Sequence, residues 1–294
     1  MKVLIVGSRG FIGAHLLRKL KQRDDIEVAE ASSQDGAFDA SGLLSSTFAV
    51  PSGTQTVVYL AQSPFYRQMP ERADHLLNVN LVSAVRLAEL SRCAGVGRFI
   101  YASTGSVYAP SFQPLAETAP LRRDGWYAWS KVAAEEALAL VRKDLDVTIV
   151  RPFGVYGPGQ SKMLVARLIE SVEAEQEMTL DRRAGNPDDG DGLRISLCYV
   201  DDAVAILETL LDRAGPPVLN LAGLEPVSIR QLATEIARQL GKQPRLRLVD
   251  RNREGDLIAD ASLLRATFTR GFTSLAEGIR QTIESKFATA CRTE

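Results

Sequence analysis

The sequence has few of the residues that build metal centres and disulfide frameworks. Its 294 residues include three cysteines and two histidines. The cysteines, Cys93, Cys198 and Cys291, are far apart and form no CxxC pair, which argues against a zinc site or a disulfide scaffold. Only His15 and His75 are available, so a multi-histidine metal site cannot be built and no metal is expected.

The sequence also lacks an excess of either charge and lacks long apolar runs. It has 35 basic and 36 acidic residues, and a net charge of −1 gives no general attraction for nucleic acid or an anionic membrane. No segment approaches the roughly 20 apolar residues of a membrane-spanning helix. The apolar run at the N-terminus ends at Gly7 and is too short for a signal peptide. We therefore expect a cytoplasmic protein whose partner is a small molecule.

The first half alternates short β-rich runs with amphipathic helical patterns. Residues 2–6 form a continuous apolar run, typical of a strand buried on both faces of a parallel sheet. Residues 11–20 follow with helical spacing of their apolar positions. Further strands are predicted at 26–31, 56–61, 98–103 and 147–151, and further helices at 76–93 and 126–141. This alternation predicts an α/β fold with a doubly wound parallel sheet and helices on both faces.

The second half is less regular after about Gly159. Its predicted elements are a helix at 161–178, a strand at 195–199, a helix at 201–211 and a strand at 218–221. A capping box at Ser228–Gln231 predicts the start of a further helix, which ends at Gly241. The change of texture indicates a second, smaller lobe.

A glycine-rich loop joins the first predicted strand to the first predicted helix. Its sequence is GSRGFIG, residues 7–13. Glycines at these positions permit a tight turn, close approach of the backbone to a pyrophosphate, and close helix packing. The following helix presents its N-terminal N–H groups to phosphates. Because the loop follows a strand and opens a helix, it predicts a dinucleotide site.

The choice between NAD and NADP depends on the residues after the second strand. An acidic side chain about 20 residues beyond the loop binds the ribose hydroxyls of NAD. Here the strand runs into Ser32, and Glu30, the nearby carboxylate, comes early. Arg9 would suit a 2′-phosphate, although it is equally open to being a solvated loop residue. We predict an NAD(P) cofactor, with NADP favoured over NAD.

The segment YAWSK, residues 127–131, carries a phenol and an ammonium at helical spacing. Tyr127 and Lys131 lie at i and i+4 and share one helix face. A neighbouring cation lowers the pKa of a tyrosine, so that the phenol exchanges a proton near neutral pH. Thr104 follows the strand at 98–103, at the sheet edge where ligands bind. Its hydroxyl would hydrogen-bond a substrate oxygen beside Tyr127.

In this order and at this spacing, the motifs resemble those of the extended short-chain dehydrogenase/reductases, and specifically the NAD(P)-dependent epimerase/dehydratase family. The resemblance covers nearly the whole chain. It rests on GSRGFIG, Asp39, YLAQ at 59–62, Asn80, STGSVY at 103–108, YAWSK, RPFGVYGPG at 151–159, YVDDA at 199–203 and NLAG at 220–223. It implies a Rossmann domain over 1–160, to which 193–222 returns, and a substrate-binding lobe mainly in 161–294.

The resemblance also implies roles for individual residues. Tyr127 would be the acid/base, Thr104 its hydroxyl partner, and Lys131 the residue that binds the cofactor ribose and lowers the phenol's pKa. Asp39 would contact the adenine and Asn80 would support the lysine, although capping or turn formation explains either residue alone. The cofactor-binding residues implied are Gly7, Arg9, Gly10, Phe11, Ile12, Gly13, Ser32, Asp39, Ala40, Leu60, Ala61, Asn80, Tyr127, Lys131 and Pro152. In relatives, the helices matching 76–93 and 126–141 form a dimer interface, which implies a homodimer.

A second group of residues concerns the substrate. REGD at 253–256 followed by ADAS at 259–262 resembles a segment of nucleotide-sugar 4-epimerases in which the arginine holds the diphosphate. Arg194 lies one residue from the family's second phosphate-binding arginine, and Gly154 replaces a frequent asparagine. The candidate substrate-binding residues are Thr104, Ser106, Gly154, Arg194 and Arg253. The 4,6-dehydratases of the family carry an acidic pair just after the threonine, and here Gly105 and Ser106 take those two positions. Ser106 also replaces the cysteine of 3,5-epimerases, and no histidine follows His75.

What remains is hydride transfer at one carbon, C4, of a nucleotide-activated sugar. A 4-epimerase and a 4-ketoreductase would use the same side chains. Arg9 and Ser32 favour the reductase, and REGD with ADAS favours the epimerase. Two alternatives stay open. An NADPH-dependent reductase of a non-sugar aldehyde or ketone is favoured by Gly154 and disfavoured by Arg253. A non-catalytic dinucleotide sensor is disfavoured by the intact Thr104, Tyr127 and Lys131.

Overall fold

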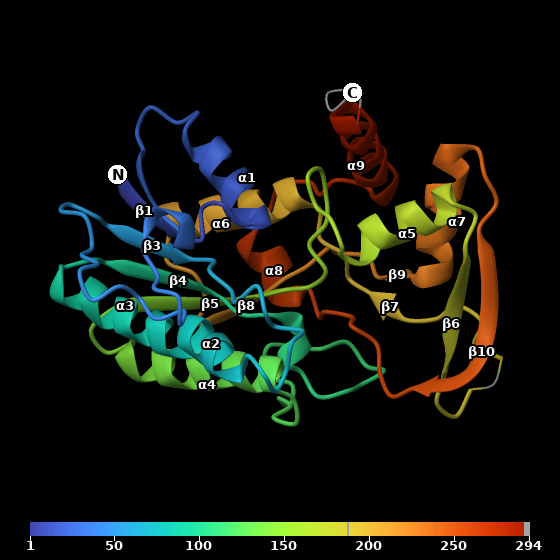
Figure 1. Ribbon diagram of the computed structural model, residues 1–294, viewed down its shortest axis with the longest axis horizontal. Helices are drawn as coiled ribbons and strands as arrows, with labels where there is room; N and C mark the ends of the chain where they lie inside the picture. The colour runs from blue at the N-terminus through green and yellow to red at the C-terminus, as the bar shows by residue number, and fades with distance from the viewer. Residues whose placement is uncertain (187, 291–294) are drawn as a thin grey trace. The chain divides into compact units, whose positions relative to one another are not determined.

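The computed structural model describes residues 1–186 and 188–290, so Cys291 lies outside the described residues. The chain divides into two compact units, and Figure 1 gives the course of the chain through both. The first unit comprises residues 1–109, 120–151 and 204–219. The second unit comprises 110–119, 152–203 and the described residues from 220 onward.

The first unit is built on a six-stranded sheet with the order β2-β1-β3-β4-β5-β8. The strands are β1 (Lys2–Val6), β2 (Glu27–Ala31), β3 (Thr56–Tyr59), β4 (Arg98–Ala102), β5 (Asp146–Pro152) and β8 (Val218–Leu221). The pairs β1–β2, β1–β3, β3–β4 and β4–β5 are parallel. Strand order reverses at β1, and ligands of such sheets bind beyond the carboxyl ends of the strands at this point. The predicted doubly wound α/β fold is confirmed.

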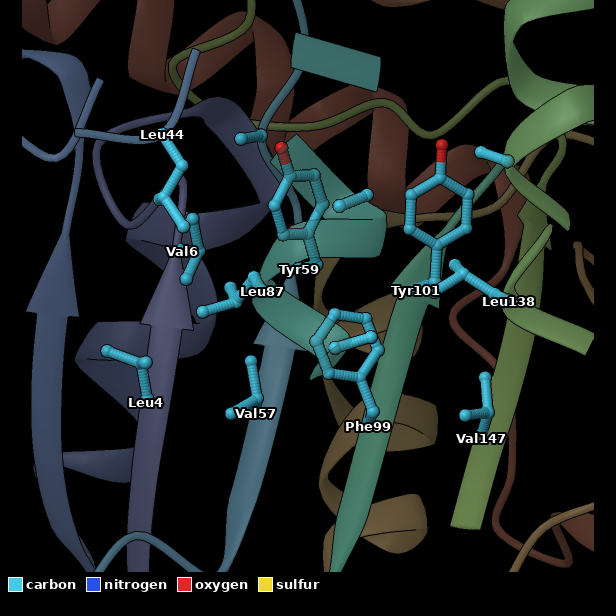
Figure 2. Close-up of a cluster of buried hydrophobic side chains, with 14 of the residues drawn as sticks. Leu4, Val6, Leu44, Val57, Tyr59, Leu87, Phe99, Tyr101, Leu138 and Val147 are labelled. Atoms are coloured by element: carbon cyan, nitrogen blue, oxygen red, sulfur yellow. The ribbon is translucent and has the colours of Figure 1, made fainter. Parts of the chain in front are cut away.

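Helices cover both faces of this sheet (Figure 1). One face carries α1 (Phe11–Leu20) and α6 (Val200–Asp212), and the other carries α2 (Ala73–Leu77), α3 (Ser83–Cys93) and α4 (Trp126–Val141). Alternate strand residues point to the same face. The core under α3 and α4 therefore consists of residues two apart on neighbouring strands. Figure 2 shows Leu4, Val6, Val57, Tyr59, Phe99, Tyr101 and Val147 with Leu87 and Leu138 from the helices.

The single helix predicted over 76–93 is wrong. The segment is a short helix, α2, then a π-helical turn at Asn78–Val82, and then α3. Apolar residues recur through the turn, so the hydrophobic pattern gave no sign of the break. A π-helical turn interrupts the regular i to i+4 hydrogen-bond ladder and is frequent at functional sites.

The second unit contains two small sheets. Strand β6 (Glu177–Arg183) pairs in parallel with β10 (Arg245–Arg253), and β7 (Arg194–Ile195) pairs antiparallel with β9 (Val227–Ser228). The helix predicted over 161–178 is α5 (Leu164–Glu173) and ends early, because β6 begins at Glu177. The strand predicted over 195–199 reduces to β7 and is not part of the six-stranded sheet.

The helices of the second unit lie before, between and after these strands in the sequence. They are α5, α7 (Ile229–Leu240), α8 (Ser262–Thr267) and α9 (Leu275–Ala290). The predicted capping box is confirmed, since the Ser228 side chain and Gln231 satisfy each other's backbone amides. Within residues 1–186 and 188–290, no helix is long and apolar enough to cross a membrane.

Candidate active site

The glycine loop packs its backbone directly against the ends of β2 and β3. The Gly7 amide donates to the Ala31 carbonyl at 2.7 Å, and a Cβ on Gly7 would lie 2.7 Å from the Ala61 nitrogen. A Cβ on Gly13 would lie 2.1 Å from the Gly7 carbonyl oxygen. The Leu60 amide donates to the Val6 carbonyl at 2.8 Å, which joins β1 to the end of β3. Side chains at these glycines would therefore force the loop open.

The start of α1 fits the pyrophosphate of a dinucleotide. Gly10 is the N-cap and makes no side-chain cap, and the first turn, which begins with Phe11 and Ile12, holds no acidic residue. The first amides of a helix have no acceptor within it, and the positive end of the helix dipole favours an anion there. Residues 7–13 thus offer backbone donors and no competing negative charge.

A charged cluster lies directly after β2. The Arg9 guanidinium donates to Gln34 Oε1 at 2.6 Å and to Asp35 Oδ1 at 2.5 Å. The Ser32 hydroxyl donates to the other Asp35 oxygen at 2.5 Å. The Asp35 carboxylate therefore accepts hydrogen bonds from both residues on which the predicted preference for NADP rested, Arg9 and Ser32. Asp35 was not predicted as a site residue, because it lies in a short 3-10 turn, Ser33–Asp35, beyond the end of the strand.

Asp39 organises its own loop. Its carboxylate accepts hydrogen bonds from the Ser41 hydroxyl at 2.6 Å, the Ser41 amide at 2.8 Å and the Leu43 amide at 3.1 Å. The Ser41 hydroxyl is the main cause that holds the pKa of Asp39 below its ordinary value. These bonds correspond to the turn-forming role. Asp39 and Ala40 both lie on this loop, where Ala40 is exposed.

Tyr127 lies in the first turn of α4 beside two polar partners. Its hydroxyl donates to Gln62 Oε1 at 3.0 Å, and its ring lies 5.5 Å from that of Tyr66, centroid to centroid. Burial raises the pKa of the Tyr127 phenol to about 12, and a hydrogen bond with the Thr104 hydroxyl acts in the opposite direction. The predicted pair of Thr104 and Tyr127 is thus together in the structure.

Lys131 is buried one helical turn further along α4. It is 2% exposed, and its ammonium donates to the Ala102 carbonyl at 2.7 Å and lies 4.8 Å from the centre of the Tyr101 ring. Burial lowers the pKa of Lys131 to about 7, while the nearby Glu135 carboxylate raises it. The ammonium is therefore close to losing its proton near neutral pH, and its neighbours decide its charge.

Glu135 belongs to a buried ionic network that the sequence analysis did not find. It accepts from the Ser103 hydroxyl, and from Arg151 Nε at 3.1 Å and Nη2 at 2.5 Å. Arg151 Nη1 also donates to the Tyr108 hydroxyl at 2.9 Å. The available signal was a glutamate four residues after Lys131 on the same helix face. This network fixes the carboxylate next to the lysine.

Asn80 lies in the π-helical turn and is fully buried. Its side-chain amide donates to the Ser130 hydroxyl at 3.0 Å, and its side-chain oxygen accepts from the Ser63 amide at 3.4 Å. The Ser130 hydroxyl in turn donates to the Tyr127 carbonyl at 2.8 Å. Asn80 thereby connects the segment after β3 with the helix that carries Tyr127 and Lys131.

In the second unit, Arg253 is held by protein acceptors. It is 9% exposed, and its Nε donates to Asp256 at 3.0 Å, its Nη1 to the Asp181 carbonyl at 2.9 Å, while its Nη2 lies 2.5 Å from Asp189. Its three nitrogens thus face two carboxylates and one carbonyl. A diphosphate would have to displace one of these partners.

The other substrate candidates of the second unit lie around β7. Arg194 is exposed, its amide donates to Asp256 Oδ1 at 2.9 Å, and its guanidinium donates to Asp191 at 3.2 Å. Gly154 has φ +51°, and a Cβ there would lie 2.8 Å from methyl carbons of both Ile195 and Leu197. A side chain at this position would therefore meet two methyl groups of the second unit.

The remaining candidates lie at strand ends. Pro152 is the last residue of β5, and Ser106 is exposed after β4, with its amide donating to the Thr104 hydroxyl at 3.1 Å. Within residues 1–186 and 188–290, no group of three or more His, Cys, Asp or Glu side chains could hold a metal ion.

The match to known families agrees with this geometry. Residues 3–222 match the NAD dependent epimerase/dehydratase family, and the chain belongs to that family. It is 28% identical to a dTDP-4-dehydro-6-deoxy-D-allose reductase of Streptomyces bikiniensis, over 84% of this chain and 83% of the relative. It is also 28% identical to a UDP-glucose 4-epimerase of Mycolicibacterium smegmatis, over 97% of this chain and 98% of that protein.

A solved structure extends the likeness to the whole chain. The NAD-dependent NDP-hexosamine 5,6-dehydratase TunA, of tunicamycin biosynthesis, superposes with a TM-score of 0.79 at 25% identity. The match covers 98% of this chain and 98% of TunA. Fold and family are thereby established for both halves of the sequence.

Proposed function

We propose that this chain is an NAD(P)-dependent enzyme acting by hydride transfer at C4 of a nucleotide-activated sugar, as a 4-epimerase or a 4-ketoreductase. The observation that carries the proposal is the cluster of Thr104, Tyr127 and buried Lys131 after β4 and on α4. Relatives named as a sugar reductase and a sugar 4-epimerase support the substrate class. In this proposal residues 1–160 with 193–222 bind the dinucleotide, and 161–294 mainly bind the substrate.

The residues of the cluster divide the proton chemistry among them. When bound, the nicotinamide dinucleotide takes a hydride from the substrate carbon or delivers one to it. Tyr127 removes the proton of the substrate hydroxyl in oxidation and returns a proton to the carbonyl oxygen in reduction. Thr104 hydrogen-bonds the same oxygen. The Lys131 ammonium lowers the pKa of the phenol and so stabilises its ionised form.

For the cofactor we propose a preference for NAD, although Arg9 and Ser32 in the sequence favoured NADP. Asp35 bridges those two residues and would repel a 2′-phosphate placed beside them. The same carboxylate would accept a hydrogen bond from the 2′-hydroxyl of NAD. The side chains of Arg9 and Asp35 are 53% and 35% exposed, so the ion pair itself adds little stability.

We further propose a homodimer through the outer faces of α3 and α4. Val82 beside α3 is 44% exposed, and on α4 Trp129 is 37% and Leu140 is 80% exposed. Exposed large apolar side chains on the helices that form the dimer interface of relatives support this proposal. Sedimentation of the purified protein tests this, and a monomer at all concentrations would contradict it. The cytoplasmic location stays a prediction.

The cofactor state of the purified protein tests the proposed reaction. A 4-epimerase retains NAD tightly and releases it on denaturation. A 4-ketoreductase is isolated without cofactor and oxidises reduced dinucleotide when given a nucleotide 4-keto-6-deoxy sugar. Failure with every nucleotide sugar tried would contradict both forms of the proposal.

One observation favours a second candidate, a reductase of a non-sugar aldehyde or ketone. Arg253 is already paired with Asp189 and Asp256, so its guanidinium is occupied before any diphosphate arrives. Turnover of simple carbonyl compounds, unaffected by Arg253→Lys, would support this candidate. Loss of nucleotide-sugar turnover in the same variant would support the first proposal. A dinucleotide sensor remains the outcome if Tyr127→Phe leaves biological activity unchanged.

A further inference from the structure

Two buried tyrosines stand side by side beneath the π-helical turn. Tyr59 of β3 and Tyr101 of β4 are register partners, and their ring centres are 5.8 Å apart. Figure 2 shows both hydroxyl groups pointing the same way. The Tyr59 hydroxyl donates to the Val79 carbonyl at 2.6 Å, and the Tyr101 hydroxyl donates to the Asn80 carbonyl at 2.7 Å. The two phenols therefore bind consecutive carbonyls of one turn.

These two bonds supply hydrogen-bond donors to carbonyls of the turn. Its carbonyls are buried where the regular helical ladder is interrupted, and buried carbonyls without donors are destabilising. With its backbone fixed in this way, Asn80 directs its side chain to Ser130 on α4. In this respect the two tyrosines are equivalent.

They differ in what their rings face. The ring of Tyr101 lies 4.8 Å from the Lys131 ammonium, and Lys131 donates to Ala102, the next residue of the strand. The ring of Tyr59 packs instead near Phe99, with centroids 6.3 Å apart. Of the two, it is Tyr101 that combines a bond to the π-helical turn with contact to the lysine.

We propose that Tyr101 is a positioning residue whose ring holds the Lys131 ammonium in place and in its charged form. The role assumes the proposed function, since it acts through Lys131 on Tyr127. The face of an aromatic ring carries partial negative charge and attracts a cation, most strongly where water is excluded. Without that face, a buried ammonium loses its proton more easily, and a neutral lysine no longer lowers the pKa of Tyr127.

Other groups act on the same pair, and the test must hold them constant. Glu135 lies on the same helix, paired with Arg151 of β5, and Tyr66 lies against Tyr127. The titratable groups that face Lys131 or Tyr127 are Tyr66, Tyr101 and Glu135, and Arg151 acts on the pair through Glu135. Of these groups, the comparison below changes only Tyr101.

The experiment compares Tyr101→Leu with Tyr59→Leu. Each variant removes one buried ring and one bond to the π-helical turn, but only the first removes the ring that faces Lys131. The readout is the pH dependence of kcat/KM for substrate oxidation, which requires ionised Tyr127. We expect Tyr101→Leu to move the midpoint upward by about one pH unit, with about tenfold lower activity at neutral pH. We expect Tyr59→Leu to keep the wild-type midpoint. Equal midpoints in the two variants would overturn the proposal.

A second series serves if Tyr101→Leu does not fold. Phenylalanine and its progressively fluorinated analogues at position 101 keep the ring's shape while weakening its negative face. The midpoint should rise with each fluorine at position 101 and stay constant in the same series at position 59. A flat series at position 101 would overturn the proposal.

The variant Tyr127→Phe separates this proposal from the proposed function. Difference titration of each variant against the same variant carrying Tyr127→Phe isolates the Tyr127 phenolate and needs no substrate. If Tyr127→Phe retains full turnover, the proposed function is wrong. If Tyr127→Phe is inactive and Tyr101→Leu leaves the phenolate titration unchanged, only the role of Tyr101 is wrong.

Discussion

The Asp35 carboxylate lies 2.5 Å from the Arg9 guanidinium, and its other oxygen accepts a hydrogen bond from Ser32. The end of β2 therefore presents a carboxylate, as NAD-binding sheets do, but supplies it from a turn beyond the strand. This relationship underlies the proposed preference for NAD, whereas Arg9 and Ser32 in the sequence favoured NADP, and it makes the cofactor choice testable at one residue.

Replacing Asp35 by Asn should shift the preference towards NADP. The substitution removes the negative charge and leaves Arg9 available for a 2′-phosphate, so we expect the ratio of NADP to NAD affinity to rise about tenfold. Dissociation constants of both dinucleotides provide the measurement. Asp25→Asn, which also breaks an exposed pair with an arginine, is the control. An unchanged ratio in Asp35→Asn would show that Asp35 does not select the cofactor.

Replacing Glu135 by Gln should destabilise the protein strongly. Arg151 would be left buried without its carboxylate, which costs about 3–5 kcal/mol in the free energy of unfolding. Denaturation in urea measures the loss. Glu136→Gln is the matched control, since Glu136 pairs with Arg123 at the surface and should change stability by less than about 1 kcal/mol. Equal losses would contradict the account of the buried network.

Replacing Gly154 by Ala should destabilise the second unit through a clash with Ile195 and Leu197. Gly159→Ala is the control, because Gly159 also has positive φ, yet among the described residues none beyond its own chain neighbours has an atom within 4 Å of the position that its Cβ would take. Both variants lose the conformational freedom of glycine, and only Gly154→Ala adds the clash. We expect Gly154→Ala to be less stable than the control by about 1–3 kcal/mol. Equal stabilities would mean that the packing around Gly154 yields easily.

Lys131 should make the stability of the free protein rise with pH above neutrality. Its pKa is lowered to about 7 in the folded chain, from an ordinary value of 10.5. Between these values the unfolded chain binds the extra proton, so the free energy of unfolding increases with pH. Lys131→Met should reduce that slope by up to about 1.4 kcal/mol per pH unit. Parallel curves for the two proteins would contradict the lowered pKa.

The sequence predicted the elements whose signals are local. The bounds of β1, α1, α4 and β8 agree with the predicted ranges, because the apolar runs and the spacing that predict them lie within each segment. The π-helical turn was not predicted, because its residues keep the apolar pattern of a regular helix. The long strand β10 was missed because only a few apolar residues interrupt its charges.

The residues of the candidate site fall into the same two groups, those with a local signal and those without one. Thr104, Tyr127 and Lys131 follow from motifs within single segments. Asp35, Glu135 and Tyr101 gain their importance from partners distant in the sequence, such as Arg9, Arg151 and Asn80. Such pairings depend on the order of strands in the sheet and on packing, which a motif does not specify.

The most direct measurement is turnover of nucleotide sugars by the intact protein and by Tyr127→Phe, followed through the absorbance of the reduced dinucleotide and the sugar products. The account predicts that wild-type protein converts a nucleotide sugar and that Tyr127→Phe loses at least about a hundredfold in kcat while still binding the dinucleotide. Undiminished turnover in Tyr127→Phe would contradict it.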